Sequence, residues 1–112
     1  MDGLKRGDLV VVAMSGDYGK PRPALVVQAD LFNVAHASVT LVPVTSTIVD
    51  APLFRLTVVP SPGNGLRALS QIMIDKVTTV ARARIGPTIG RVEDDVLLQV
   101  SRALALWVGI AA

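Results

Sequence analysis

The sequence predicts an α+β fold that is mainly β: a strongly bent antiparallel sheet or small barrel, closed by a C-terminal α-helix. Two observations lead to this class. Between residues 8 and 84 the chain is a series of short apolar runs, separated by segments rich in turn-forming residues. From residue 93 onward the apolar residues recur at spacings of three and four, the period of an α-helix. The length of 112 residues matches one ordinary domain, so we expect a single domain over residues 1–112.

The first strands are predicted from runs of different kinds. The run at 8–14 is β-branched, and the short apolar run at 24–29 is typical of a buried central strand. Residues 53–59 alternate apolar and polar side chains, which indicates a half-exposed strand. Pro43, within the run at 38–45, indicates a bulge or a sheet edge near the end of that strand.

One or two further strands are expected over residues 68–75 and 77–84, and the sequence IGPTIG at 85–90 is expected to close the sheet off. The helix is expected to begin near Glu93, because acidic residues in a first turn complement the helix dipole. Its apolar stripe predicts that Trp107 packs in the core. The residues of this stripe are Val96, Leu97, Val100, Ala103, Leu104, Trp107 and Ile110.

Composition excludes several kinds of site. The absence of cysteine excludes disulfides and thiolate metal ligands, and the single histidine, His36, has no partner at metal-site spacing. We therefore expect no metal and no cofactor, and His36 is expected to be a solvent-facing loop residue. No segment approaches the roughly 20 apolar residues of a membrane span, and the N-terminus has no apolar run like that of a signal peptide. A cytoplasmic location is expected, and the net charge of +2 permits an anionic partner.

Pro21 and Pro23 enclose a candidate functional residue, Arg22. Each proline fixes its own φ and pushes the residue before it toward an extended conformation, so the backbone of Arg22 is restricted from both sides. The simpler interpretation is a positive charge at the end of a strand. A cation held this firmly is also suited to binding a phosphate group.

Other polar residues complete a set of guanidinium and hydroxyl groups. Individually the hydroxyl groups are explained by turn formation. Together with Arg22 they can bind a phosphodiester and stabilise the charge that develops in phosphoryl transfer, but they include no strong base to activate water. RNA supplies its own nucleophile, the 2′-hydroxyl, so RNA is the substrate that this set predicts, with RNA binding without cleavage as an alternative. The set comprises Thr45, Ser46, Thr47, Gln71, Arg82 and Arg84.

Several motifs resemble the MazF/PemK-like toxins (mRNA interferases) of the CcdB/MazF superfamily. The segment RGDLVVVAMSGDYGKPRPALVVQAD is similar to the opening of these proteins, and VTLVPVTST and LSQIMIDKVTTVARARIG extend the similarity over nearly the whole chain. The resemblance implies an SH3-like barrel that forms a homodimer. It also implies a metal-independent endoribonuclease that cuts single-stranded RNA, leaves a 2′,3′-cyclic phosphate and a 5′-hydroxyl, arrests growth and is neutralised by a cognate, MazE-like antitoxin.

Residue by residue, the resemblance implies that Arg22 and Thr45 are the catalytic arginine and threonine. It also implies that the loop at 15–20 is a gate over the RNA, with contacts from Asp17, Tyr18 and Lys20. Many members of the family carry a basic residue shortly after a glutamine of the fifth strand, where this chain has Ile72, Met73 and Ile74. The remaining RNA contacts are expected from Ser46, Thr47, Gln71, Arg82 and Arg84.

The chain end LALWVGIAA suggests an alternative function. CcdB-like gyrase poisons, which are not enzymes, act through a C-terminal Trp-Gly-Ile, and this chain carries Trp107, Gly109 and Ile110. Val108 interrupts the motif, and helical spacing places Trp107 on the apolar stripe. The gyrase-poison interpretation therefore ranks second.

Overall fold

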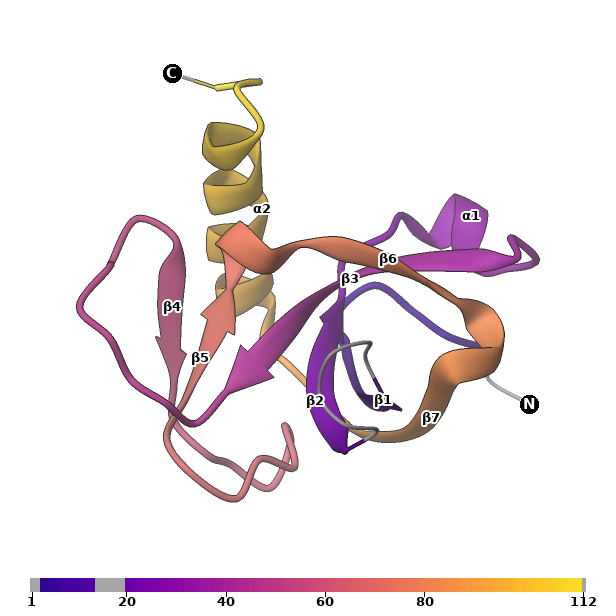
Figure 1. Cartoon of the computed structure of the whole chain (residues 1–112), viewed down its shortest axis with the longest axis horizontal. Coiled ribbons are helices and arrows are strands. Elements are labelled where there is room, and N and C mark those ends of the chain that lie inside the picture. Colours follow the sequence, from indigo (N-terminus) through magenta and orange to yellow (C-terminus); the bar gives the residue numbers. More distant parts are fainter. Residues whose placement is uncertain (1–2, 14–19, 112) are drawn as a thin grey trace.

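A bent antiparallel sheet makes up most of the structure, a computed structural model that describes residues 3–13 and 20–111. The strands lie side by side in the order β4-β5-β3-β2-β1-β7, and β6 pairs with β3 off this path (Figure 1). Within the described residues no pairing joins β4 to β7, so the sheet is bent like a barrel without closing. The elements are β1 (Asp8–Ala13), β2 (Pro21–Val26), α1 (Asp30–Asn33), β3 (Ser38–Thr45), β4 (Arg55–Val58), β5 (Ser70–Met73), η1 (Ile74–Lys76), β6 (Thr78–Ala81), η2 (Arg82–Arg84), β7 (Ile85–Arg91) and α2 (Asp94–Trp107).

Strand β3 is the centre of the sheet. One edge pairs with β2, whereas the other pairs first with β6, over residues 38–41, and then with β5 at Val44 and Thr45. Pro43 lies between these two pairings, opposite Ala24 of β2. Pro43 therefore lies in a central strand and not at an edge of the whole sheet, but the pairing with β6 and β5 skips it, so a proline without an N–H is accommodated where the strand changes partner.

The central strands bury both of their faces. Neighbouring residues such as Leu9 and Val10 belong to two different core clusters, and so do Leu41 and Val42. Burial on both faces explains why these strands read as continuous apolar runs rather than as alternating patterns. One cluster includes Leu9, Leu25, Val42, Val44, Ile72, Val100 and Ala103, and the other includes Val10, Val12, Ala24, Val26, Val39, Leu41 and Val80.

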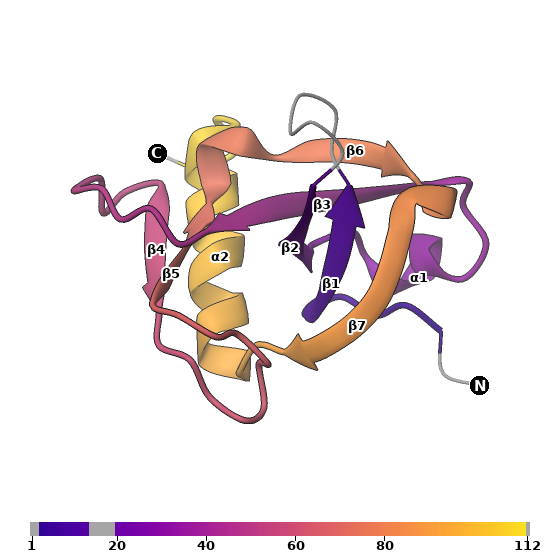
Figure 2. The same ribbon diagram turned by 60° about the horizontal axis from the view of Figure 1, so that its bottom comes forward.

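Helix α2 packs beside β4 and β5 (Figures 1 and 2). Val100 and Ala103 are buried, Val96, Leu97 and Leu104 pack against the same cluster, and acidic residues occupy the first turn, as predicted. Among the described residues no helix is long and apolar enough to cross a membrane.

The prediction that Trp107 packs in the core is wrong. Trp107 is the last residue of α2 and is 49% exposed, with its ring against that of Phe54 at a centroid distance of 5.6 Å. Ile110 lies beyond the helix and is 82% exposed. Figure 1 shows that the C-terminal turns of α2 extend past the ends of β4 and β5. Trp107 ends the helix and so belongs to these turns, which explains its exposure.

The segment IGPTIG, expected to close the sheet off, is itself part of strand β7. It is an edge strand that pairs only with β1 among the described residues, and its register shifts twice along β1. Edge position and bulges are the circumstances in which strands tolerate Gly and Pro. Gly86 is required by packing, because a Cβ at this residue would lie 2.8 Å from the carbonyl oxygen of Val11. Strand β2 also begins three residues before the predicted start, at Pro21.

Candidate functional site

A groove of about 740 Å³ opens between the first residues of β2 and the last residues of β3. The two strands pair only over residues 24–26 of β2, since Pro21 to Pro23 continue along β1 while the end of β3 pairs with β5. The divergence of the strands leaves room for the groove, and the loop between β4 and β5 closes one side of it. The lining residues are Val11, Lys20, Pro21, Arg22, Pro23, Val44, Thr45, Ser46, Gly65, Leu66, Arg67, Ala68, Ser70 and Ile89.

Arg22 lies at the mouth of this groove, as an exposed residue of β2 opposite Val12 of β1. The prolines on both sides are themselves strand residues, which agrees with the extended conformation predicted for this segment. At Pro21 and Pro23 the edge of β2 that faces away from β1 has no strand partner among the described residues, so the missing N–H groups interrupt no ladder. The sequence thus fixes a cation at the point where the sheet opens.

Thr45, the last residue of β3, lines the same groove as Arg22. Its Oγ1 accepts a hydrogen bond from the backbone N–H of Thr47 at 3.1 Å. This bond orients the hydroxyl of Thr45 and leaves its proton available for donation. Ser46 also lines the groove, whereas Thr47 contributes its backbone rather than its side chain.

The charge of the groove is of one sign. Its charged lining residues are Lys20, Arg22 and Arg67, and none of the described lining residues is acidic. Apart from the hydroxyl residues Thr45, Ser46 and Ser70, the other lining residues are apolar, such as Val44 and Leu66. Apolar surroundings weaken the screening by water and strengthen the attraction of these cations for an anion.

Gln71 does not line the groove. Gln71 of β5 pairs with Thr45 of β3, so its backbone is close to the groove. Its side chain is buried, however, with only 3% of the residue exposed. Its amide accepts from the backbone N–H of Val49 at 3.1 Å and donates to the carbonyl oxygen of Val49 at 2.9 Å and to the hydroxyl of Thr57 at 3.2 Å. These bonds hold the segment after β3 in place, and we omit Gln71 from the proposed RNA contacts.

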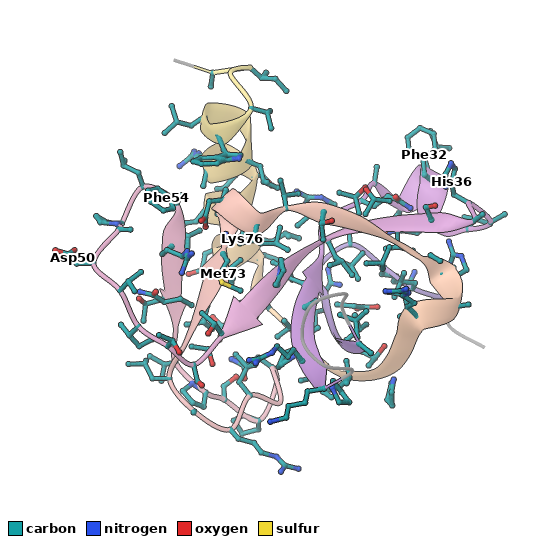
Figure 3. All side chains as sticks on the ribbon, in the orientation of Figure 1. Phe32, His36, Asp50, Phe54, Met73 and Lys76 are labelled. Atoms are coloured by element: carbon teal, nitrogen blue, oxygen red, sulfur yellow. The ribbon has the colours of Figure 1, made fainter. Side chains whose placement is uncertain are left out.

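Arg82 and Arg84 also lie away from the groove, in η2, which follows the strand that pairs with the other end of β3. Arg82 donates hydrogen bonds to the carbonyl oxygens of His36 and Asn33, both at 2.7 Å. Its guanidinium therefore ties η2 to the α1 end of the molecule. Figure 3 shows His36 at that end, across the molecule from Met73 of β5. His36 itself is an exposed loop residue, as expected.

Asp17 and Tyr18 lie outside the described residues. Of the other predicted contacts, the structure brings Lys20, Arg22, Thr45 and Ser46 together. Arg67, which no motif of the sequence indicated, completes the cationic lining. The sequence feature that could have indicated Arg67 is Leu66, an apolar residue after the glycine-rich tip of the loop. An apolar residue at this point indicates that the loop is anchored in the core, which fixes the position of the next residue.

Comparison with solved structures shows which proteins share this fold. Mycobacterium tuberculosis toxin MazF-mt6 matches with a TM-score of 0.80 over 94% of this chain and 99% of that chain, at 19% sequence identity. The MazE-MazF structure (Form-II) from Deinococcus radiodurans matches with a TM-score of 0.79 over 99% of this chain and 100% of that chain, at 24% identity. The predicted fold, a bent barrel-like sheet with a C-terminal helix, is confirmed as that of MazF toxins.

Sequence comparison then gives the family. Residues 5–108 match the model of PemK-like, MazF-like toxins of type II toxin-antitoxin systems. Over 109 residues the chain is 46% identical to the probable endoribonuclease MazF of Mycolicibacterium smegmatis, with 96% of this chain and 99% of that relative covered. The chain therefore belongs to the PemK/MazF-like toxin family, which confirms the resemblance found in the motifs.

Proposed function

We propose that this toxin is an endoribonuclease that cleaves single-stranded RNA, and that the groove between β2 and β3 is its active site. The observation that carries the proposal is a groove whose described charged lining residues are Lys20, Arg22 and Arg67, with the hydroxyl of Thr45 beside them. Such a lining suits a polyanion that brings its own nucleophile. The name of the M. smegmatis relative, a probable endoribonuclease, supports the same activity.

In the proposed reaction the 2′-oxygen attacks the adjacent phosphorus and the bond from phosphorus to the 5′-oxygen breaks. The products are a 2′,3′-cyclic phosphate and a 5′-hydroxyl, so the proton lost from the 2′-hydroxyl is balanced by one gained at the leaving oxygen. In this proposal Arg22 binds the scissile phosphate, stabilises its developing negative charge and serves as the proton donor to the leaving oxygen. Thr45 orients the 2′-hydroxyl or the phosphate through its own hydroxyl group.

The proposed partners are a second copy of the chain and a cognate, MazE-like antitoxin. The MazE-MazF structure from D. radiodurans, which shares the fold, contains a toxin of this fold together with MazE. An acidic antitoxin segment that covers the groove would complement its cations and exclude RNA. We propose the cytoplasm, where messenger RNA is translated, as the place of action.

The test is cleavage of single-stranded RNA in excess chelator. We expect Arg22→Ala to reduce the rate about a hundredfold or more, because the loss of a group aimed at developing charge costs about 3 kcal/mol. The matched control is Arg102→Ala, which removes an exposed cation of α2 outside the groove. Normal cleavage by the Arg22 variant would remove Arg22 from the catalytic site.

The gyrase-poison alternative has one observation in its favour, the exposure of Trp107 and Ile110. The family match and the cationic groove favour RNA cleavage. The same protein preparation distinguishes the two functions. Intact RNA together with inhibited DNA gyrase would support the gyrase interpretation, and cleaved RNA with unaffected gyrase supports the ribonuclease.

A further inference from the structure

The loop between β4 and β5 (residues 59–69) brings to the groove a cation that the proposed reaction does not use. Arg67 is exposed and lines the groove with Lys20 and Arg22. The structure gives it no hydrogen bond or ion pair with any other described residue. Arg67 therefore has a position in the groove but no structural role that would explain its charge.

The loop is held from the inside by Asn64. This residue is 5% exposed, and its Oδ1 accepts hydrogen bonds from the backbone N–H groups of Ser61 and Leu66, both at 3.0 Å. Its Nδ2 donates to the carbonyl oxygen of Val59 at 2.9 Å. Both the oxygen and the nitrogen of this buried side-chain amide are hydrogen-bonded to the loop backbone, and these bonds fix the conformation of the loop.

The residues next to Arg67 are also anchored. Gly65 has a φ of +71°, and a Cβ on it would lie 2.1 Å from the carbonyl oxygen of Ile89, so the loop backbone rests directly on β7. Leu66 is 8% exposed and belongs to the core cluster, and the hydroxyl of Ser70 donates to the carbonyl oxygen of Ala68 at 2.8 Å. The backbone of Arg67 is thus fixed on both sides, which lowers the entropic cost of ordering its side chain on a ligand.

We propose that Arg67 binds an RNA phosphate next to the scissile one and holds the strand in register over Arg22 and Thr45. This inference rests on the proposed function. The groove volume of about 740 Å³ is that of a site for a ligand larger than one phosphate group. Since RNA carries one negative charge per nucleotide, a groove that holds more than one nucleotide needs a cation for each phosphate it neutralises.

The lining favours a phosphate over a base as the ligand of Arg67. Base reading by arginine is bidentate and planar, and an acidic partner or a stacked aromatic ring helps to hold the guanidinium in that plane. The described lining residues include neither an acidic nor an aromatic side chain. A guanidinium without such a partner acts mainly as a positive charge. It contacts RNA phosphates, and phosphate contacts do not depend on the base sequence of the RNA.

The test measures binding and its salt dependence. The probe is a single-stranded, fully 2′-O-methylated RNA, which cannot be cut by its own 2′-hydroxyl, and the readout is fluorescence anisotropy at several salt concentrations. We expect Arg67→Ala to weaken binding roughly tenfold, since a hydrogen bond to a charged group is lost. The slope of log K against log salt should fall in magnitude by about 0.7, the value for one phosphate of a single strand.

Two control variants separate charge from other effects. Arg67→Lys keeps a positive charge on a flexible side chain, so it should restore the salt slope and most of the affinity. Arg102→Ala removes one exposed positive charge elsewhere and should bind like the original protein. Thermal unfolding of each variant checks that the fold is unchanged, as the exposure of Arg67 predicts.

Cleavage kinetics separate this role from that of Arg22. Arg67→Ala should raise KM about tenfold, with kcat within a few fold of the original and the cleavage position unchanged, because binding is lost equally from ground and transition states. Unchanged affinity and salt slope would overturn the inference while leaving the ribonuclease intact. A loss confined to particular RNA sequences would overturn it too, in favour of a base contact. If the original protein neither binds nor cuts RNA, the proposed function itself fails.

Discussion

At the scale of single residues, the candidate site depends on how the backbone presents two side chains. Arg22 is placed by its proline neighbours at the start of β2, and Thr45 by the last residue position of β3. Neither position requires a flexible loop. Both are set by strands whose other residues lie in the core, so the geometry of the pair is fixed when the sheet forms.

Thr45 offers a test in which shape and chemistry are separated. Thr45→Val keeps the branched shape but removes the hydroxyl, and we expect kcat to fall about 10- to 100-fold, the effect of one hydrogen bond to a charged group. Thr45→Ser should retain most of the rate. The bond to the N–H of Thr47 is also lost in the Val variant, and urea unfolding should detect a destabilisation of about 1 kcal/mol. A Val variant that cuts RNA at the original rate contradicts the assigned role.

At the scale of secondary-structure elements, an ion pair holds the edge of the sheet. Arg55 of β4 donates to Asp75 of η1 through Nε at 2.8 Å and through a terminal nitrogen at 3.1 Å, and both side chains are 15% exposed. The hydrogen bonds from Arg55 lower the pKa of the Asp75 carboxyl below its ordinary value, and those same bonds raise the pKa of Arg55. The two-pronged pair connects β4 to the element that follows β5.

This pair predicts how stability depends on pH. Because the pKa of Asp75 is lower in the folded chain, the unfolded chain binds more protons between the two pKa values, and stability rises with pH there. The contribution is fully present above the ordinary carboxyl pKa and is lost as the pH falls through the lowered value of the folded state. We expect Asp75→Asn to cost about 1–3 kcal/mol at pH 7 and much less near pH 2, measured by urea unfolding.

The matched control is Asp50→Asn, which makes the same change in charge at an exposed loop residue (Figure 3). It should leave the free energy of unfolding within about 0.5 kcal/mol of the original. An equal loss of stability for both variants, or a loss for Asp75→Asn that does not diminish at low pH, would show that the ion pair does not carry the effect.

Elements with a strong pattern were predictable from the sequence, and the others were not. The bounds of β1 and β3 and the start of α2 lie within one residue of the prediction, because their apolar residues are dense and regular, whereas α2 ends three residues before Ile110, the last residue of the predicted stripe. Strand β7 was missed because Gly and Pro are depleted in strands in general, and only its edge position and close approach to β1 explain them here. Helix α1 has only four residues, too few for a periodic pattern.

For the candidate site too, residues with a local sequence signal were predictable and residues placed by tertiary contacts were not. Arg22, Thr45, Ser46 and Lys20 were predictable because local sequence marks the ends of the strands that carry them. The positions of Arg67 and Arg82 depend on tertiary contacts: one on the anchoring of the loop before β5, the other on bonds to the α1 end. A local sequence pattern does not show where in the fold a cation from a distant part of the sequence lies.

At the scale of the whole molecule, one bent sheet buries both faces of its central strands and opens where β2 and β3 diverge. The partner change of β3 at Pro43 is the cause, because it directs the end of the strand toward β5 and away from β2. The groove is thus a consequence of the topology, and the residues that line it supply a positive field and a hydroxyl group. We propose that cleavage in this groove requires attack by the 2′-hydroxyl of the substrate's ribose.

The most direct test of that claim uses two RNA strands that differ in one atom. Cleavage of the first strand is mapped to find the cut site, and the second carries a 2′-deoxynucleotide on the 5′ side of that site. We predict that the first strand yields 2′,3′-cyclic phosphate and 5′-hydroxyl ends, and that the second stays intact at that site. Cleavage of the 2′-deoxy strand at the same position, or products that carry a 5′-phosphate, would contradict the account.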